Sequence, residues 1–333
     1  MSSETEYEIL AALLDAGGAC VSGERLASRL GVSRVAVFHH VAKLRAAGHP
    51  VEAVRAGGYR IAREPARLTR LGLRHALAAR GVGAGAFTLL ESVDSTNDEA
   101  ARQLAAGREA PFVILAGRQT KGRGRFGRPW HSGTRRNLYA SFAFRPRMPA
   151  PRMQTFTLWI GAALARFLTE ATGARVGVKW PNDLLIGGKK AAGILTEARM
   201  DADQIRDLVT GIGLNLRPPA GGWPEELRGR ATSLAENMPA PPPAHALVAG
   251  LVARVFEAYG EFVEGRHHEA FARDWAAHDV LVGRDVGIVS GNECFSGTVG
   301  GIDAEGSLLM KGADGAARVF RAGEVTIGKG GAA

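Results

Sequence analysis

Residues 122–130 read Gly-Arg-Gly-Arg-Phe-Gly-Arg-Pro-Trp, and this stretch decides which kind of α/β fold the chain can have. Gly122–Gly127 matches the G-x-G-x-x-G pattern of a dinucleotide-binding turn, but Pro129 follows where a helix would have to open. The acid that such a turn needs about 20 residues later is missing, because no acid lies between Glu109 and Glu170. The Gly-Lys-Ser/Thr of a Walker loop is absent too. The sequence therefore excludes a doubly wound dinucleotide domain.

The same stretch lies in a strongly basic segment. The basic residues from Gly117 to Arg147 are Arg118, Lys121, Arg123, Arg125, Arg128, Arg135, Arg136, Arg145 and Arg147. Alternating glycine and arginine leave backbone N–H groups uncovered beside guanidinium groups, so the loop can wrap a phosphate or a carboxylate. A disordered RNA-binding run and a solvated charge run are the alternatives. The loop is single, short and flanked by strand patterns, which favours an ordered anion clamp.

Strand-like and helix-like stretches alternate around this loop. A helix is expected over residues 156–171, and Gly187-Gly188 has the pattern of a hairpin turn. The stretches with strand patterns are residues 87–93, 111–116, 138–144, 184–186, 192–196 and 208–216. A proline-rich connector precedes a second helix over residues 245–263. Hairpins with interspersed helices predict an α+β core with a mixed sheet.

Residues 1–66 have the pattern of a winged helix-turn-helix. Ser22 can cap a short helix that ends at Gly31, and Ser33 can cap the next helix. The apolar residues on one face of that next helix are Val37, Val41 and Leu44. Two short strand patterns around a turn at residues 55–58 then form the wing.

Positive charge gathers in this N-terminal region. Between Arg25 and Arg63 the only acid is Glu52. A basic winged helix is attracted to the DNA backbone, although a helix-packing module with a solvated arginine face has the same pattern. The candidates for contact with a DNA groove are Ser33, Arg34, His39, His40, Lys43 and Arg55.

Composition limits the remaining classes. The chain has 333 residues and a formal net charge of +9, which favours anionic partners. Its longest apolar stretch, residues 157–168, falls short of the ~20 residues of a membrane helix, and no secretory signal is expected after Met1. Cys20 and Cys294 are far apart, so we expect no disulfide framework and no Cys-type zinc site. These features fit a reducing cytoplasm.

Two further polar motifs can take part in a site. Lys179-Trp180-Pro181-Asn182-Asp183 precedes the hairpin, and Lys189-Lys190 begins its far strand. Neighbouring side chains on a strand point to opposite faces, so only one of these lysines can face a given site. Asp94-Ser95-Thr96-Asn97 lies between a strand and a helix. The simpler interpretations are a pair of exposed lysines for the first motif and a helix cap for the second. The sequence has no metal-binding or nucleophile motif, so together with the anion clamp its residues favour phosphate or acyl-phosphate chemistry.

Taken together, the motifs resemble the family of bacterial bifunctional biotin protein ligases and biotin operon repressors. The stretches that carry the resemblance are residues 94–97, 122–130, 179–183, 190–195 and 211–215. The resemblance covers nearly the whole chain and implies an α+β protein of three domains. They are a winged helix-turn-helix over residues 1–66, a mixed-sheet α/β core of the biotin/lipoate ligase type over residues 67–275, and an SH3-like β-barrel over residues 276–333.

The resemblance implies a cytoplasmic biotin–[acetyl-CoA-carboxylase] ligase that uses biotin, ATP and Mg²⁺. It would form biotinyl-5′-adenylate and transfer biotin to a lysine of the biotin carboxyl carrier protein of acetyl-CoA carboxylase. The implied catalytic residues are Lys190, Arg123 and Arg125. The implied biotin-binding residues are Ser95, Thr96, Asn97, Gln119, Arg123, Gly124, Arg125, Trp130, Lys190 and Gly193. The implied ATP- or adenylate-binding residues are Arg123, Arg125, Arg128, Trp130, Lys190, Asn215 and Trp223, and the implied Mg²⁺ ligands are Asn182 and Asp183.

The resemblance also implies a homodimer that binds operator DNA and represses biotin biosynthesis, with no membrane contact. The chain departs from the family in the DNA-binding part. Gly57 takes the place of a lysine that the family often has in the wing turn, and His39 takes the place of a basic residue that is often near the middle of the recognition helix. Two rival interpretations are a ligand-sensing transcription factor with a degenerate ligase core and a lipoate-type protein ligase. The intact loop and Lys190 argue against the first, and the helix-turn-helix argues against the second.

Overall fold

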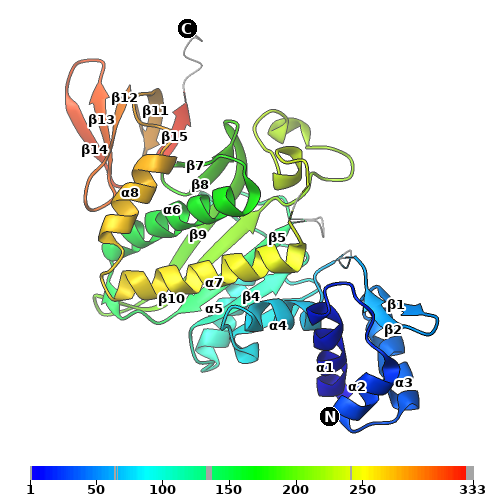
Figure 1. Ribbon diagram of the computed structural model, residues 1–333. Helices are drawn as coiled ribbons and strands as arrows, with labels where there is room; N and C mark the ends of the chain where they lie inside the picture. Colours follow the sequence, from blue (N-terminus) through cyan, green and yellow to red (C-terminus); the bar gives the residue numbers. More distant parts are fainter. Residues whose placement is uncertain (1, 64, 66, 133–136, 241, 328–333) are drawn as a thin grey trace. The chain divides into compact units, whose positions relative to one another are not determined.

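A computed structural model describes residues 2–63, 65, 67–132, 137–240 and 242–327, and they form two compact units (Figure 1). One unit comprises Met1–Ala84 and Pro242–Ala253, and the other comprises Gly85–Pro241 and Arg254–Ala333. The long helix α7 (Ala244–Val263) begins in the first unit and ends in the second.

The first unit has the predicted winged helix-turn-helix. Its elements are α1 (Ser2–Asp15), α2 (Gly23–Leu30), α3 (Arg34–Ala46), β1 (Val51–Val54), β2 (Gly58–Ile61) and α4 (Arg70–Ala78). The predicted caps are confirmed: Ser22 accepts from Arg25 N and Ser33 from Ala36 N, each at 3.1 Å. Gly31 ends α2 with a φ of 63°, which suits glycine.

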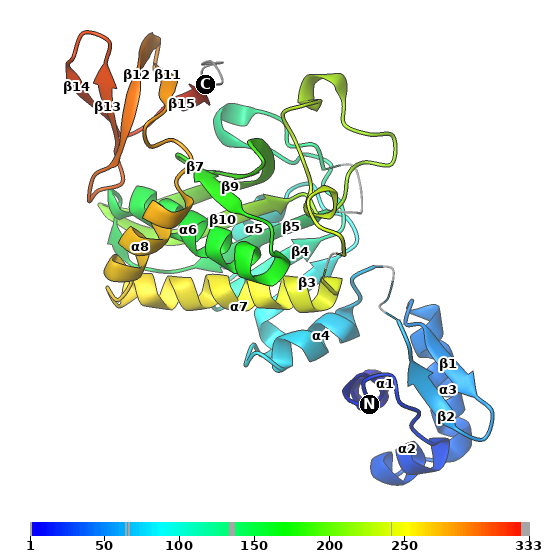
Figure 2. The same cartoon turned by 45° about the horizontal axis from the view of Figure 1, so that its top comes forward.

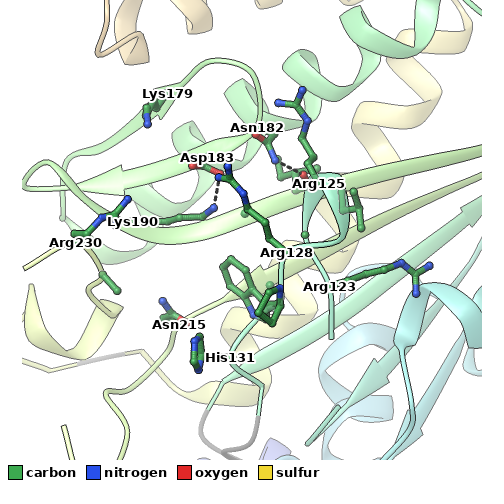
Figure 3. A pocket seen from close by; sticks show the side chains of 18 of the residues that line it. Arg123, Arg125, Arg128, His131, Lys179, Asn182, Asp183, Lys190, Asn215 and Arg230 are labelled. Atoms are coloured by element: carbon green, nitrogen blue, oxygen red, sulfur yellow. Dashed lines mark hydrogen bonds and ion pairs between the residues drawn. The ribbon is translucent and has the colours of Figure 1, made fainter. Parts of the chain in front are cut away.

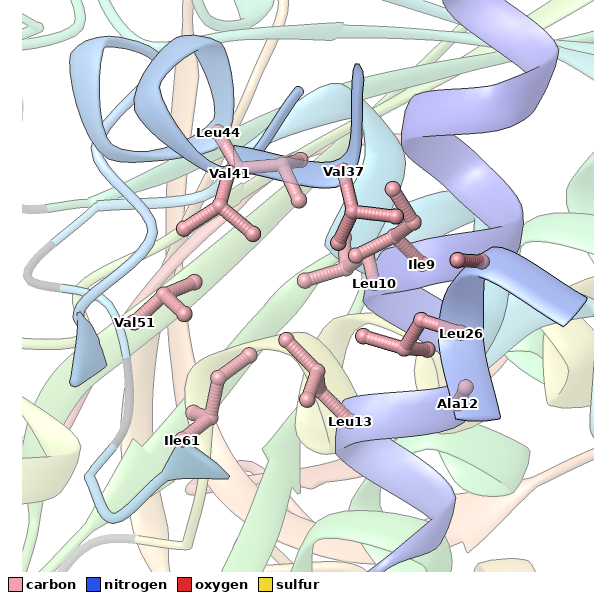
Figure 4. Close-up of a cluster of buried hydrophobic side chains, with 11 residues drawn as sticks. Ile9, Leu10, Ala12, Leu13, Leu26, Val37, Val41, Leu44, Val51 and Ile61 are labelled. Atoms are coloured by element: carbon pink, nitrogen blue, oxygen red, sulfur yellow. The ribbon is translucent and has the colours of Figure 1, made fainter. Parts of the chain in front are cut away.

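The core of this unit is a cluster of aliphatic side chains between α1, α3 and the wing (Figure 4). Its members include Ile9, Leu10, Leu13, Leu26, Val37, Val41, Leu44, Val51 and Ile61. The predicted apolar face of α3 is therefore confirmed as the buried face, and the opposite face of the helix lies open.

The second unit is built on a mixed sheet. Its strands are β3 (Phe87–Leu90), β4 (Phe112–Ala116), β5 (Leu138–Phe144), β6 (Met148–Pro149), β7 (Val176–Lys179), β8 (Asp183–Ile186), β9 (Lys189–Asp201) and β10 (Gln204–Leu214). The order is β3-β4-β5-β10-β9-β8-β7, and β6 pairs with β10. Only the pair β3–β4 is parallel among these described strands.

Strand β5 shows how the two faces of the sheet are used (Figure 2). Phe144 stacks on Tyr259 of α7 at 4.0 Å between ring centroids and meets Phe156 of α6 (Arg152–Thr172) edge to face. The alternate residues Ser141 and Ala143 face α5 (Thr96–Ala105) on the other side. Because strand side chains alternate, α6 and the part of α7 from Arg254 onward cover one face and α5 covers part of the other. The remainder of the α5 face is left for the site.

A small antiparallel β-domain follows α8 (His268–His278). Its strands are β11 (Asp285–Ser290), β12 (Glu293–Ile302), β13 (Leu308–Gly312), β14 (Ala317–Phe320) and β15 (Glu324–Ile327), in the order β14-β13-β12-β11-β15. Trp180 is 1% exposed, and its Nε1 donates to Gly306 O at 3.0 Å, which fastens this domain to the core. Within the described residues, no helix is both long and apolar enough to span a bilayer.

Candidate active site

The start of α5 forms a buried polar corner at the site. Ser95 caps the helix, and Thr96 donates from both N and Oγ1 to Gln119 Oε1 at 2.8 and 2.9 Å. Ser141 Oγ lies 2.6 Å from Asn97 Oδ1, and Asn97 Nδ2 donates to Glu197 Oε2 at 2.6 Å. The structure thus brings together the four predicted polar residues, Ser95, Thr96, Asn97 and Gln119. Ser95 is at once a helix cap and a cavity residue.

Glycines on β9 and β10 make a floor on which Trp130 lies. Gly193 and Gly213 pair with each other across the two strands. A Cβ on Gly193 would lie 3.0 Å from the indole, and a Cβ on Gly213 would lie 2.5 Å from its Cε2. The Nε1 of Trp130 is buried and has no hydrogen-bond partner among the described residues. A side chain at position 213 would therefore clash with the indole, and one at position 193 would crowd it.

The hairpin places one of its two lysines at the cavity. Lys189 is exposed, whereas Lys190 lines the cavity with its Nζ 2.6 Å from Asp183 Oδ1 (Figure 3). The Lys190 ammonium also lies 5.2 Å from the centroid of the Trp130 ring. The alternation of strand side chains therefore selects Lys190 as the lysine that can reach a ligand.

Arg123 ties the glycine-arginine loop to the sheet. Its guanidinium forms ion pairs with Asp98 at 2.7 Å and with Glu197 at 3.0 Å. These carboxylates raise the pKa of Arg123 above its already high usual value. In Figure 3 the side chain points away from Lys190 and Asp183. In the structure Arg123 thus has an anchoring position, whereas the resemblance implies a place at the reacting atoms.

Arg125 and Arg128 lie along the strand β15. Arg125 Nη1 donates to Gly323 O at 3.3 Å, and burial lowers the pKa of Arg125. Both terminal nitrogens of Arg128 bind the carboxylate of Glu324, which lowers the pKa of that carboxyl. The loop is therefore held by the C-terminal β-domain. The other predicted basic residues Arg135 and Arg136 lie outside the described residues.

These elements enclose a cavity of about 680 Å³. Its lining includes residues that the sequence did not single out as site residues, namely His131, Lys179, Glu226, Arg230 and Glu324. Burial lowers the pKa of Lys179 although Asp183 opposes this shift. Lys179 stands in the Lys-Trp-Pro-Asn-Asp motif, and this could have marked it. Arg230 and Glu324 carry no local pattern that would have marked them.

Two residues predicted for nucleotide binding, Asn215 and Trp223, also line the cavity. Asn215 is 5% exposed, and its Nδ2 donates to Thr232 O at 3.0 Å. Trp223 also lines the cavity, and its Nε1 donates to Glu236 Oε1 at 3.1 Å. Asn215 is thus fixed by a hydrogen bond to the backbone, whereas Trp223 is fixed by the side chain of Glu236.

The predicted Mg²⁺ ligands have partners already. Asn182 Nδ2 donates to Ile194 O at 2.8 Å, which fastens the turn to β9, and Asp183 is paired with Lys190. Across the described ranges no group of three or more His, Cys, Asp or Glu side chains lies together as a metal site would need. A dedicated protein cage for a metal is therefore not formed by these residues.

The winged helix presents most of the predicted DNA-contact residues to solvent. Ser33, Arg34, His39, Lys43 and Arg55 are exposed. His40 differs, because it is half-buried with its Nδ1 3.4 Å from Glu6 Oε1. The structure therefore turns His40 towards α1 and away from the open face of α3.

Two family models match separate parts of this chain. Residues 89–215 match the biotin/lipoate A/B protein ligase family, and residues 5–60 match a helix-turn-helix domain family. The bifunctional ligase/repressor BirA of Bacillus subtilis is 31% identical over 97% of this chain and 98% of its own. BirA of Escherichia coli is 30% identical over 96% of both chains.

A solved structure is similar to most of this chain. The biotin protein ligase of Aquifex aeolicus in complex with biotin and ATP has a TM-score of 0.62 and 28% identity. The match covers 73% of this chain and 99% of that one. The polar corner, the glycine floor and Lys190 all lie within residues 89–215, the range that matches the ligase family.

Proposed function

Because the chain belongs to the bifunctional ligase/repressor family, with a core of the biotin/lipoate A/B protein ligase type, we propose that its cavity joins biotin to ATP. The chain is a biotin protein ligase with a DNA-binding repressor domain. The observation that carries the proposal is Lys190, which faces a cavity enclosed by the cationic loop and floored by glycines.

The reaction needs positive charge where negative charge develops. An oxygen of the biotin carboxylate attacks the α-phosphorus of ATP, the bond to the β-phosphate breaks, and pyrophosphate leaves. Lys190 exchanges Asp183 for the phosphate and carboxylate oxygens and stabilises the charge of the transition state. Arg125 and Arg128 extend this positive charge along the loop. The lysine amine of a carrier protein then attacks the acyl carbon, and AMP leaves.

The polar corner suits the ureido ring of biotin. That ring has two N–H donors and one carbonyl acceptor, and the corner holds hydroxyl and amide groups of Ser95, Thr96, Asn97 and Gln119. Gly124 lets the ligand approach the backbone, and Gly193 leaves room for Lys190 and the Trp130 ring beside the ligand. Trp130 covers the apolar part of the ligand. Trp223 and Asn215 border the space for the adenine end.

Mg²⁺ and a homodimer belong to the proposal as well. Mg²⁺ is usually held by one or two carboxylates together with substrate phosphates, so Asp183 fits as one ligand of an ion that ATP brings, with Asn182 beside it. The ion would neutralise phosphate charge.

A homodimer would place two winged helices on a two-fold operator, as helix-turn-helix repressors do. A cytoplasmic location stays a prediction.

The decisive test is incubation of the full chain with biotin, ATP, Mg²⁺ and a biotin carboxyl carrier domain, read by intact mass. We expect the carrier to gain one biotinyl group. A carrier whose acceptor lysine is replaced by arginine is the control and should gain nothing. If lipoate is attached to its carrier as readily as biotin, the result would favour the lipoate ligase instead. If the chain binds biotin but the carrier stays unmodified, the result would favour the degenerate sensor.

A further inference from the structure

The open face of α3 carries an apolar stripe that the described function has not yet used. Val35 is 66% exposed and Phe38 is 56% exposed, although both are large hydrophobic residues. The stripe consists of Val35, Phe38, Ala42 and Ala46, which are all exposed. Their spacing of i, i+3, i+7 and i+11 places them on one line along the helix. This line lies opposite the buried residues Val37, Val41 and Leu44.

Basic side chains border the stripe on both sides. Helical geometry places Arg34 and Arg45 along one edge and His39 and Lys43 along the other. Their contacts are loose or directed elsewhere: Arg34 lies 3.6 Å from Glu24, both largely exposed, and Arg45 Nε donates to Val51 O at 2.8 Å. The face thus has an apolar centre with a cationic border, and it belongs to the second helix of the helix-turn-helix.

This arrangement fits the major groove of DNA better than a protein surface. The groove presents base edges between two rows of phosphates, and the N-terminal part of the second helix enters it. Val35 and Phe38 both lie in that N-terminal part. Cations at the border meet the phosphates, while the centre meets the bases.

The chemistry of the centre selects the base. Guanine is usually read by Arg or Lys and adenine by Asn or Gln, but the stripe offers only alkyl and phenyl groups. The one apolar group on a base edge in the major groove is the 5-methyl group of thymine. We propose that Val35 and Phe38 select DNA by contact with thymine methyl groups, which rests on the repressor half of the proposed function.

Deoxyuridine tests this directly, because it differs from thymidine only by that methyl group. The full chain, with biotin, ATP and Mg²⁺, is used to enrich duplexes from a randomised library. The enriched duplex is then made again with each thymine replaced singly by uracil. We expect roughly fourfold weaker binding for each methyl group that Val35 or Phe38 contacts, in line with the burial of one methyl or methylene group.

Variants separate base contact from charge. Phe38→Ala and Val35→Ala should reduce the thymine-over-uracil ratio at their own positions towards one. Arg34→Ala is the matched control on the border: it should weaken both duplexes equally and lower the salt dependence of binding. All three side chains are exposed, so thermal unfolding of the variants should match the parent.

Each other result overturns the inference in a distinct way. Specific enrichment with no sensitivity to uracil would leave the repressor function standing and refute the methyl contacts. No enrichment, from protein that biotinylates its carrier normally, would refute the repressor function together with the inference. A variant Phe38→Ala that dissociates an oligomer but keeps the thymine-over-uracil ratio would make the stripe a protein interface.

Discussion

Gly213→Ala should disable the ligase by moving a single indole ring. The new methyl group would lie 2.5 Å from Trp130 Cε2 and 2.7 Å from its Cζ2 and Nε1. Carbon atoms in contact prefer about 3.5–4.0 Å, so the indole must move by roughly 1 Å. Gly213 does not have a positive φ, so the backbone itself accepts alanine. The substitution is therefore expected to change only the position of the Trp130 side chain.

The displacement reaches the whole loop. Trp130 N donates to Gly122 O at 2.9 Å, so the ring and the base of the loop move together. A shift of about 1 Å in a positioning group can cost about 10²-fold in rate. We expect kcat/KM for pyrophosphate release, with biotin and ATP, to fall by about that factor, which is ~2.7 kcal/mol of transition-state stabilisation.

Two comparisons make the prediction refutable. Gly221→Ala is the matched control, because a Cβ there meets nothing within 4 Å. Trp130→Leu removes the ring that the methyl group would meet, so adding Gly213→Ala to that variant should cost little more. A Gly213→Ala enzyme within threefold of the parent would refute the reasoning. So would full additivity of the two substitutions.

Three further predictions concern single side chains. Lys190→Ala should slow pyrophosphate release in a single turnover by roughly 10²–10³-fold, as expected when one transition-state donor is lost; an unchanged rate would exclude its catalytic role. Arg125→Gly should release the adenylate early, seen as faster appearance of free biotinyl-5′-adenylate in a filter assay, and retention equal to that of the parent would show that the loop does not hold the phosphate. His49 is 3% exposed, and burial, with a smaller contribution from His245, lowers its pKa to about 4. An unfolded histidine titrates near 6.5, so between about pH 6.5 and 4 the unfolded state binds a proton that the folded state does not. The free energy of unfolding of the first unit should therefore fall by up to about 3 kcal/mol as the pH falls through that window. His49→Leu should flatten this dependence in denaturant unfolding at pH 7.5 and 5, and an equally steep loss in the variant would contradict the assignment.

Local signals explain what could be predicted of the fold. Ser22, Ser33 and Gly31 act within a few residues of themselves, so the helix ends of the winged domain follow from sequence. The strand β10 was expected from residue 208 but begins at Gln204, and its partner β9 runs on to Asp201. The extra residues are mostly polar, and among residues 204–207 only Ile205 is apolar, so no alternation of apolar residues reveals this end of the hairpin.

Contacts between distant residues explain what could not be predicted of the site. The cationic loop and Lys190 were found from their own neighbours in sequence. The carboxylates that hold the loop were not: Glu197 lies 74 residues from Arg123, and Glu324 lies 196 residues from Arg128. No periodicity connects such pairs, because they meet only when β9 and β15 are in place. Sequence therefore gives the cations of a site more readily than their counter-ions.

The geometry of the ion pairs distinguishes Lys190 and Arg123 at the cavity from Arg34 on the winged helix. In the cavity, the pairs Lys190–Asp183 and Arg123–Asp98 are 2.6 and 2.7 Å long and half-buried, so they fix the positions of the cations. On the winged helix, Arg34–Glu24 is 3.6 Å long, with side chains 74% and 72% exposed. Exposed pairs of this kind contribute about 0–1 kcal/mol, so Arg34 can leave Glu24 for a DNA phosphate at little cost. Short ion pairs thus hold Lys190 and Arg123 in place at the cavity, whereas the long, exposed contact of Arg34 lets its side chain turn to a DNA phosphate.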